Sequence, residues 1–191
     1  MIIPRITKPY EIGLPALGDD LENYLVVAGG SVTLKLEPGD KFKIINLEGL
    51  QQAELVAFNS KGECSLSPLS LKSEHKGELT KKILTSNEES AQIAYSKLKR
   101  LGHDVNSINQ SILVFSKEAE ANSIEEFSAN DSSICIISAP GEFEITHENI
   151  PASELRVIVQ RSRKREEGEF LLPDPLMDPV EEIFVKRYTA I

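Results

Sequence analysis

Residues 36–59, LEPGDKFKIINLEGLQQAELVAFN, decide the fold that the sequence predicts. The segment Glu37-Pro-Gly-Asp40 puts Pro and Gly at the two central positions of a tight turn. After it, Phe42 and Ile44 alternate with lysines, which is the period of a half-buried strand. Residues 53–58 form another apolar run after a Gly-bearing turn. The stretch therefore predicts two strands joined by short turns.

Two more strand patterns precede this stretch. Tyr24–Val27 is largely apolar, Ser31–Leu36 alternates, and Gly29-Gly30 supplies the turn between them. Four strands with short turns between them predict hairpin pairing in an antiparallel meander or a small barrel.

One helix pattern follows over residues 86–102. Ser86, with Glu89 three residues later, has the form of a capping box. Apolar residues then recur at helical spacing up to Leu101, and Gly102 stands where a C-cap is expected. Short apolar runs that predict further strands lie at residues 111–115, 134–137 and 155–160.

We therefore predict a mainly β (α+β) fold: an antiparallel β-sandwich or small barrel with one or two helices and an extended C-terminal arm. Residues 1–160 are predicted to form one globular domain. Residues 161–191 are predicted to be a linker and arm, because the run RSRKREEGE is polar and prolines recur in the residues that follow. Residues 181–188 predict a terminal strand that pairs with a partner edge.

Composition excludes some classes of protein. The 30 acidic residues outnumber the 21 Lys and Arg, giving a net charge of -9, which argues against nucleic-acid binding. No apolar run is long enough to cross a membrane and no signal peptide is visible, so we predict a cytoplasmic protein. Cys64 and Cys135 lack metal or redox spacing and are predicted to be free thiols, with Cys135 buried in a strand.

The candidate ligand-binding residues gather near the turn between two strands, where a small barrel binds ligands at its rim. They are Glu48, Gln51, Gln52 and Glu54. Solvent-facing turn residues are the simpler interpretation of the same pattern. No catalytic residue and no metal ligand is predicted.

The three histidines lie in separate segments. Glu144-x-x-His147 would put two metal ligands on one helical face, but the surrounding Gly and Pro residues favour a loop. His103 before Asp104 has the order of a base and its orienting carboxylate, whereas a helix-end histidine that answers the dipole is the simpler interpretation. His75, among lysines and a glutamate, is predicted to be exposed.

Residues 27–59 resemble the opening motif of the urea-carboxylase-associated family. The motif elements are Gly39-Asp40, the strand Phe42–Ile45, Glu48-Gly49, Gln51 or Gln52, and the strand Leu55–Asn59. The whole chain resembles the N-terminal region of fusion proteins in which such β-rich modules precede a glycine-cleavage T-protein-like aminomethyltransferase. Residues 172–179, LPDPLMDP, with Phe184-Val-Lys186, resemble the junction to the next module.

The resemblance implies an accessory or structural module of a T-protein-like aminomethyltransferase in one-carbon metabolism. It implies no cofactor in this chain, with tetrahydrofolate bound only by a downstream or partner aminomethyltransferase domain. Residues 173–191 would contact that domain, and the arm would also allow a homodimer.

The chain departs from the family pattern. Family members carry Asp where this chain has Asn46 and Glu54, and their later His-Asp and Cys region is not found here. These departures imply that the chain is not catalytic by itself, because the neutral amide of Asn46 cannot hold the charge of the carboxylate that would serve as base or metal ligand. The alternative is a small metal-dependent hydrolase of the urea-carboxylase-associated type, with Glu48, Glu54 and His147 around its site.

Overall fold

The computed structural model describes residues 21–87, 89–116, 118–140 and 153–162. In these residues eight strands, two α-helices and two short 3-10 helices follow one another. Their bounds are β1 Leu21–Val26, β2 Ser31–Leu36, β3 Lys41–Asn46, β4 Ala53–Asn59, η1 Ser67–Leu69, α1 Glu78–Leu84, α2 Glu89–Arg100, η2 Val105–Ser107, β5 Ile112–Val114, β6 Ser123–Ser128, β7 Ser133–Ser138 and β8 Leu155–Gln160.

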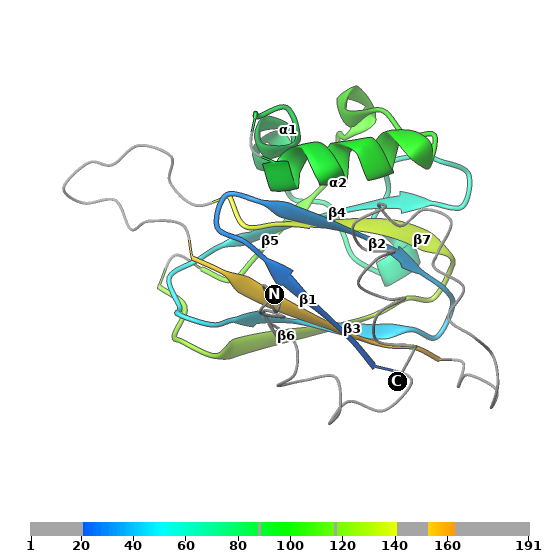
Figure 1. Cartoon of the computed structure of the whole chain (residues 1–191). Coiled ribbons are helices and arrows are strands. Elements are labelled where there is room, and N and C mark those ends of the chain that lie inside the picture. Colours follow the sequence, from blue (N-terminus) through cyan, green and yellow to red (C-terminus); the bar gives the residue numbers. More distant parts are fainter. Residues whose placement is uncertain (1–20, 88, 117, 141–152, 163–191) are drawn as a thin grey trace, which may run out of the picture.

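The strands form two antiparallel sheets that pack face to face (Figure 1). Sheet A has the order β1-β8-β3-β6 and sheet B the order β2-β7-β4-β5. Successive strands from β1 to β4 thus alternate between the sheets, which is the strand arrangement of a jelly roll. The predicted antiparallel β-sandwich with one or two helices is confirmed.

The predicted hairpin pairing of neighbouring strands is wrong. β2 pairs with β7 rather than with β3, and β3 lies between β6 and β8 in the other sheet. The turn at Gly39, whose φ is +89°, carries the chain from one sheet to the other instead of closing a hairpin. A turn pattern gives the change of direction, but the partner of each strand comes from a distant part of the chain.

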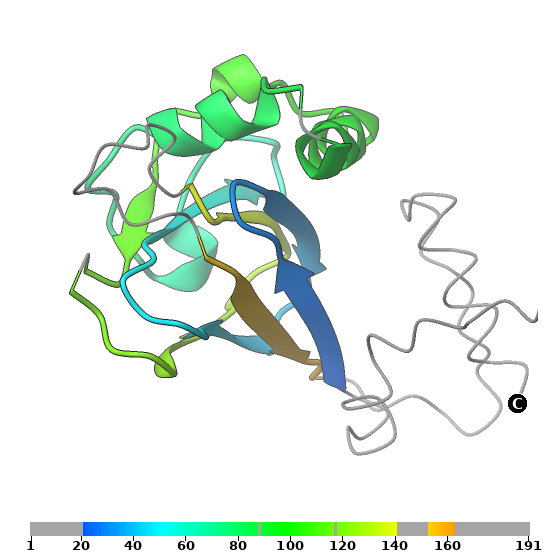
Figure 2. The ribbon, with the colours of Figure 1, turned by 60° about the vertical axis from the view of Figure 1, so that its left-hand side comes forward.

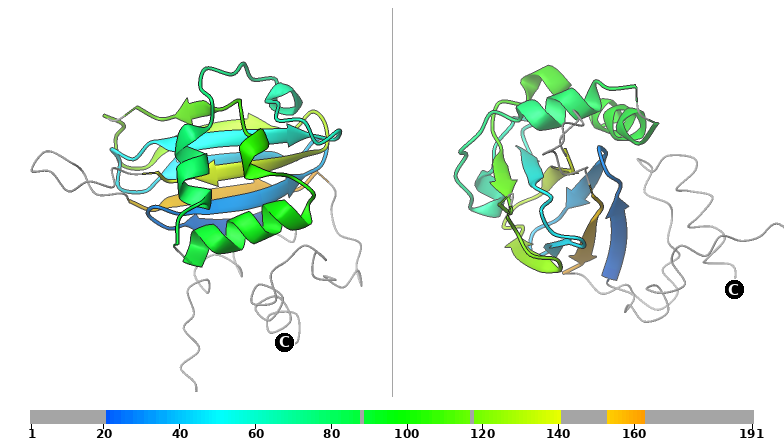
Figure 3. Two further views of the ribbon diagram at one scale, coloured as in Figure 1. Left: turned by 90° about the horizontal axis from the view of Figure 1, so that it is seen from above. Right: turned by 90° about the vertical axis from the view of Figure 1, so that its left-hand side faces the viewer.

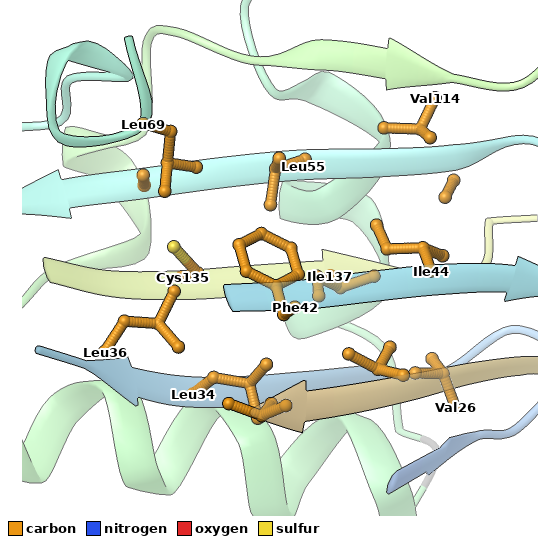
Figure 4. Close-up of a cluster of buried hydrophobic side chains, with 14 of the residues drawn as sticks. Val26, Leu34, Leu36, Phe42, Ile44, Leu55, Leu69, Val114, Cys135 and Ile137 are labelled. Atoms are coloured by element: carbon orange, nitrogen blue, oxygen red, sulfur yellow. The ribbon is translucent and has the colours of Figure 1, made fainter. Parts of the chain in front are cut away.

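The space between the sheets is filled with apolar side chains (Figure 4). Phe42 and Ile44 from sheet A meet Leu34, Leu55 and Ile137 from sheet B. Each of these side chains is at most 2% exposed, and burial of one such side chain contributes roughly 1.5–3 kcal/mol. The alternation read from the sequence therefore gives the inward face of these strands correctly.

Among the described residues, helices cover the outer face of sheet B alone. The helices α1 and α2 lie over this face: α1 crosses the strands, whereas α2 runs roughly along them next to β2 (Figure 3). Val56 and Phe58 of β4 point outward and pack against Leu84 and Leu98 of the helices. In the described residues no helix covers the outer face of sheet A, which is the lower layer in Figure 1 and is also visible in Figure 2.

The end of α2 follows the sequence prediction. Gly102 has a φ of +84°, its N–H donates to Lys99, and the N–H of His103 donates to the carbonyl of Leu98. These two bonds make a Schellman motif. The helix begins at Glu89 rather than directly after Ser86, and residue 88, which precedes it, lies outside the described residues.

None of the helices in the described residues is long and apolar enough to cross a membrane. The domain division at residue 160 stays a prediction, because residues 163–191 lie outside the described residues. Arg161 and Ser162, the first two residues of the predicted arm, are hydrogen-bonded to Asp40 of the turn before β3.

Candidate functional site

The inward face of β3 ends on a polar residue. Phe42, Ile44 and Asn46 alternate along this strand and point between the sheets. Asn46 is fully buried, although its two inward neighbours on the strand are apolar. Burying an amide destabilises the fold unless its polar atoms form hydrogen bonds, so the hydrogen-bond partners of Asn46 indicate the chemistry of this site.

Only half of the Asn46 side chain is satisfied. Its Nδ2 donates to the carbonyl oxygen of Gln51 at 2.7 Å. Because a carbonyl oxygen only accepts hydrogen bonds, the amide nitrogen must face it and Oδ1 must point the other way. Oδ1 is buried and has no hydrogen-bond partner among the described residues.

Beside Asn46 lies Ser153, whose side-chain oxygen is also buried without a partner in the described residues, and Gln51 connects the two. Gln51 is 4% exposed, and its Oε1 accepts the backbone N–H of Ser153 at 2.9 Å. Ser153 stands two residues before Leu155, which is the cross-strand partner of Asn46. The Oγ of Ser153 is also buried and has no partner in the part of the chain that the structure describes. We call Asn46, Gln51, Gln52 and Ser153 the Asn46 pole.

The turn that holds the Asn46 pole is tightly fixed. Gly49 has a φ of +78°, and a Cβ there would lie 2.7 Å from the carbonyl oxygen of Ala119. Leu50 also has a positive φ, of 61°, and its N–H donates to the same carbonyl. The Nε2 of Gln51 donates to the carbonyl of Gln52 at 2.5 Å. The left-handed backbone conformations of Gly49 and Leu50, which Gly adopts most easily, thus fix the position of Gln51 at this end of the sandwich.

The chemistry available at the Asn46 pole is binding rather than proton transfer. Its side chains are amides and a hydroxyl, which do not titrate near neutral pH. Oδ1 of Asn46 offers an acceptor, and Oγ of Ser153 can both donate and accept. Two buried oxygens without a partner among the described residues leave hydrogen-bonding capacity unused at this end of the sandwich.

The predicted ligand-binding residues do not stay together. Gln51 and Gln52 belong to the Asn46 pole, whereas Glu48 is exposed to solvent. Glu54 points to the opposite face of β4, under α1. The sequence prediction missed Asn46 and Ser153 as site residues. The alternation of Phe42, Ile44 and Asn46 indicated that Asn46 points inward. No local pattern indicated Ser153, which comes next to Asn46 only because β3 pairs with β8.

The carboxylate of Glu54 stabilises the start of helix α1. Its Oε2 accepts the backbone N–H of Thr80 at 2.5 Å and its Oε1 accepts the hydroxyl of Ser111 at 2.8 Å. The Oγ of Ser111 in turn accepts the N–H of Gly77. Gly77 is the N-cap of α1 and has no side chain, so the carboxylate from β4 caps the helix in its place.

The structure also bears on the hypothesis that His103 is a base oriented by Asp104. His103 stacks on Phe58 with ring centroids 4.5 Å apart. Burial lowers the pKa of His103, and a hydrogen bond with Gly62 opposes this only in part. The carboxylate of Asp104 accepts the N–H of Asn106 and caps η2, so the structure gives no sign of a base with its orienter.

His147 and Glu144 lie outside the described residues. In residues 21–87, 89–116, 118–140 and 153–162, no group of three His, Cys, Asp or Glu side chains is placed to hold a metal ion. Both cysteines are free and Cys135 is buried, as predicted, and Cys64 is buried as well.

The sequence matches no protein-family profile. It is 31% identical, over 196 aligned residues that cover 99% of this chain, to the trimethylamine-oxide aldolase of Ruegeria pomeroyi. The chain spans about a quarter of that relative, 24% of its length. Among solved structures it is similar to a DUF1989 family protein from Silicibacter pomeroyi, with a TM-score of 0.47 and 14% identity, over 75% of this chain and 80% of that protein.

This relationship corrects the functional prediction. The relative is named as an aldolase of trimethylamine oxide, so the predicted accessory module of a T-protein-like aminomethyltransferase is wrong, as is the link to glycine cleavage. The alternative of a small metal-dependent hydrolase has no support either. The turn and strand motif of residues 27–59 belongs to the jelly roll itself, and a fold element does not specify chemistry. The cofactor prediction and the partner contact through residues 173–191 stay predictions, and those residues lie outside the described part of the chain.

Proposed function

We propose that this chain is part of an enzyme that acts on trimethylamine oxide or on a similar small amine oxide. The observation that carries the proposal is the 31% identity to a trimethylamine-oxide aldolase over 99% of the chain. Because the chain spans a quarter of that relative, the proposal gives it a share of the reaction site rather than the whole of it.

The Asn46 pole is the part of the chain that we assign to substrate binding. An amine oxide has one oxygen that accepts hydrogen bonds and methyl groups that carry part of the positive charge of the nitrogen. The hydroxyl of Ser153 can donate to that oxygen, and Oδ1 of Asn46 can accept weak C–H contacts from the methyl groups. The pole holds no carboxylate or histidine, so we assign it positioning of the substrate rather than proton transfer.

The test uses the protein expressed from its complete reading frame, with the Ruegeria pomeroyi enzyme assayed in parallel. Consumption of trimethylamine oxide is followed through the loss of its methyl proton resonance. We expect the protein to consume it. No consumption by this protein, under conditions where the relative consumes it, would overturn the proposed function.

The variant Ser153→Ala tests the assignment of the Asn46 pole separately. It removes a hydroxyl that has no hydrogen-bond partner among the described residues, so the fold should tolerate it. One lost hydrogen bond to a neutral substrate raises KM by roughly twofold to tenfold, because such a bond contributes about 0.5–1.5 kcal/mol. Ser60→Ala, in an exposed turn, is the matched control. An unchanged KM for Ser153→Ala would remove the pole from the site and leave the proposed substrate untouched.

A further inference from the structure

The outer face of sheet A, which no described helix covers, carries a row of three aliphatic side chains and one arginine across its four strands. The strand register places Leu25 beside Arg156, Arg156 beside Ile45, and Ile45 beside Ile124. All four point outward, because the residues that alternate with them along the strands face the core. Ile158 lies in the next row, beside Lys43. We call Leu25, Ile45, Arg156, Ile124 and Ile158 the sheet A patch.

This row is unusual for a sheet face that meets water. Antiparallel sheets with one solvated face normally place polar residues on it. Here Leu25 is 38% exposed and Ile124 is 49% exposed. On sheet B the corresponding outward residues, such as Val56 and Phe58, are covered by the helices of the chain itself. An exposed aliphatic row of this kind indicates an interaction surface.

The charges around the row indicate what kind of surface it meets. Arg156 stands in its centre, and Lys41 and Lys43 lie on the same outward face in the following rows. Glu126, beside Lys43, is the acidic residue of that face among the described strands. The face is therefore cationic, although the chain as a whole has a net charge of -9.

A second copy of the chain fits this face poorly. A symmetric contact would bring Arg156 and the two lysines of one copy toward the same cations of the other copy. Like charges across an interface oppose association, whereas carboxylates on the partner would favour it. The relative is about four times as long as the part that this chain matches, so a polypeptide of that type has further surfaces to offer.

We propose that the sheet A patch docks a second folded protein surface, one that presents aliphatic side chains around at least one carboxylate. The aliphatic row packs against the partner, and its carboxylate pairs with Arg156. This inference does not depend on trimethylamine oxide as substrate, because it rests on the strand register, the exposure and the charge of the patch.

The first test measures whether the patch is covered in the native assembly. Hydroxyl-radical labelling of Leu25 and Ile124 is compared between the protein isolated under native conditions from its source cells and the 191-residue chain alone. Covering the patch would reduce the exposed fraction of Ile124 from 49% to below a tenth, so its labelling should slow by roughly fivefold. Ile93 on α2, which lies over the other sheet, is the internal reference. Equal labelling in the two samples would overturn the proposal.

The same labelling experiment distinguishes the proposed partner from a second copy of the chain and from the chain's own residues. If the chain alone shows protection that increases with its concentration, a second copy occupies the patch and the proposed partner is wrong. If the chain alone shows strong protection at every concentration, its own residues cover the patch, and the proposal is again overturned.

The second test addresses the chemistry of the partner. A carbodiimide joins an amine to a carboxylate in direct contact, so Lys41 or Lys43 should form cross-links to Asp or Glu of the partner surface. Arg156→Glu should reduce these cross-links about tenfold and restore the labelling of Ile124, because it places like charges at the contact. Lys99→Glu, an exposed charge reversal on α2, should do neither. Cross-links that survive Arg156→Glu unchanged would count against the proposal.

Discussion

The guanidinium of Arg161 donates two hydrogen bonds to the carboxylate of Glu22, from Nε to Oε1 at 2.9 Å and from Nη2 to Oε2 at 2.7 Å. Its Nη1 donates to Asp40 at 2.8 Å and to the carbonyl of Lys35. The residue after β8 is thereby joined to β1, to the end of β2 and to the turn before β3. Arg161 was predicted to belong to a solvated linker, and its surroundings show a partly buried ion-pair network instead.

Removal of this guanidinium should destabilise the fold. Asp40 is only 2% exposed, so Arg161→Ala leaves a buried carboxylate without its cation and should lower the free energy of unfolding by about 2–4 kcal/mol. Arg161→Lys keeps the charge but loses the planar fork, and an intermediate loss is expected. Urea unfolding followed by circular dichroism measures the change. The control is Lys35→Ala, whose half-exposed pair with Glu37 should contribute less than about 1 kcal/mol.

The same carboxylate gives the stability a dependence on pH. Burial by itself raises the pKa of Asp40, but hydrogen bonds from the N–H groups of Glu37 and Ser162 and the pairing with Arg161 outweigh it and hold the pKa below 3.8. A lowered pKa means that the stabilisation is complete above the ordinary value and is lost as the pH falls through the folded value. The stability deficit of Asp40→Asn should therefore be largest near pH 7 and shrink below about pH 4. Urea midpoints of both proteins between pH 7 and 2.5 give the comparison, and a deficit that is constant over this range would contradict the expectation.

Loss of the carboxylate under α1 should loosen that helix. Glu54→Ala leaves the N–H of Thr80 and the hydroxyl of Ser111 buried without their acceptor, which should cost about 2–4 kcal/mol. Glu54→Gln keeps one acceptor oxygen and should cost less. Hydrogen exchange of the α1 amides together with urea unfolding measures both effects. Glu78→Ala, which removes an exposed carboxylate from the first turn of the same helix, is the matched control and should leave the exchange of these amides nearly unchanged.

Thr80 offers a stabilising change at the same place. Its Oγ1 is buried and has no partner among the described residues, while its N–H donates to Glu54. Thr80→Val replaces the hydroxyl by a methyl group of similar size and keeps the backbone bond. The free energy of unfolding should rise by up to about 1 kcal/mol, because the desolvation cost of the hydroxyl disappears. A loss of stability would show that this hydroxyl has a partner in solution.

The parts of the fold that could be predicted are those with local signals. β8 at Leu155–Gln160 and the Schellman end of α2 follow directly from apolar runs and from Gly102. β6 was missed because its sequence, SIEEFS, lies at a sheet edge and is largely exposed. α1 was missed because its cap comes from Glu54, more than twenty residues earlier in the chain. Strand partners were also mispredicted, because they are distant in the sequence: this jelly roll pairs β1 with β8 and β2 with β7.

The candidate site shows the same division. Gln51 and Gln52 were predicted because they follow a turn between two strands, and their role in binding stays a prediction. Glu48 and Glu54 were grouped with them by sequence distance, although Glu54 lies on the other face of β4. The departure at Asn46 was interpreted only as a lost carboxylate. Its importance as a buried, half-satisfied amide depends on β3 and β8 being neighbours, which no local pattern indicates.

Cys135 should be chemically inert while the protein is folded. It is fully buried between the sheets, and this burial raises the pKa of its thiol to about 12, with the hydroxyl of Ser133 opposing the shift only in part. At pH 8 about one thiol in ten thousand is then a thiolate, the form that reacts with alkylating reagents. Pulse labelling with iodoacetamide and mass spectrometry should find Cys135 unmodified in water and modified in urea in parallel with global unfolding. Cys64, which is 9% exposed at the edge of the helical layer, should react first. Faster modification of Cys135 than of Cys64 in the folded protein would mean that the two sheets separate locally without global unfolding.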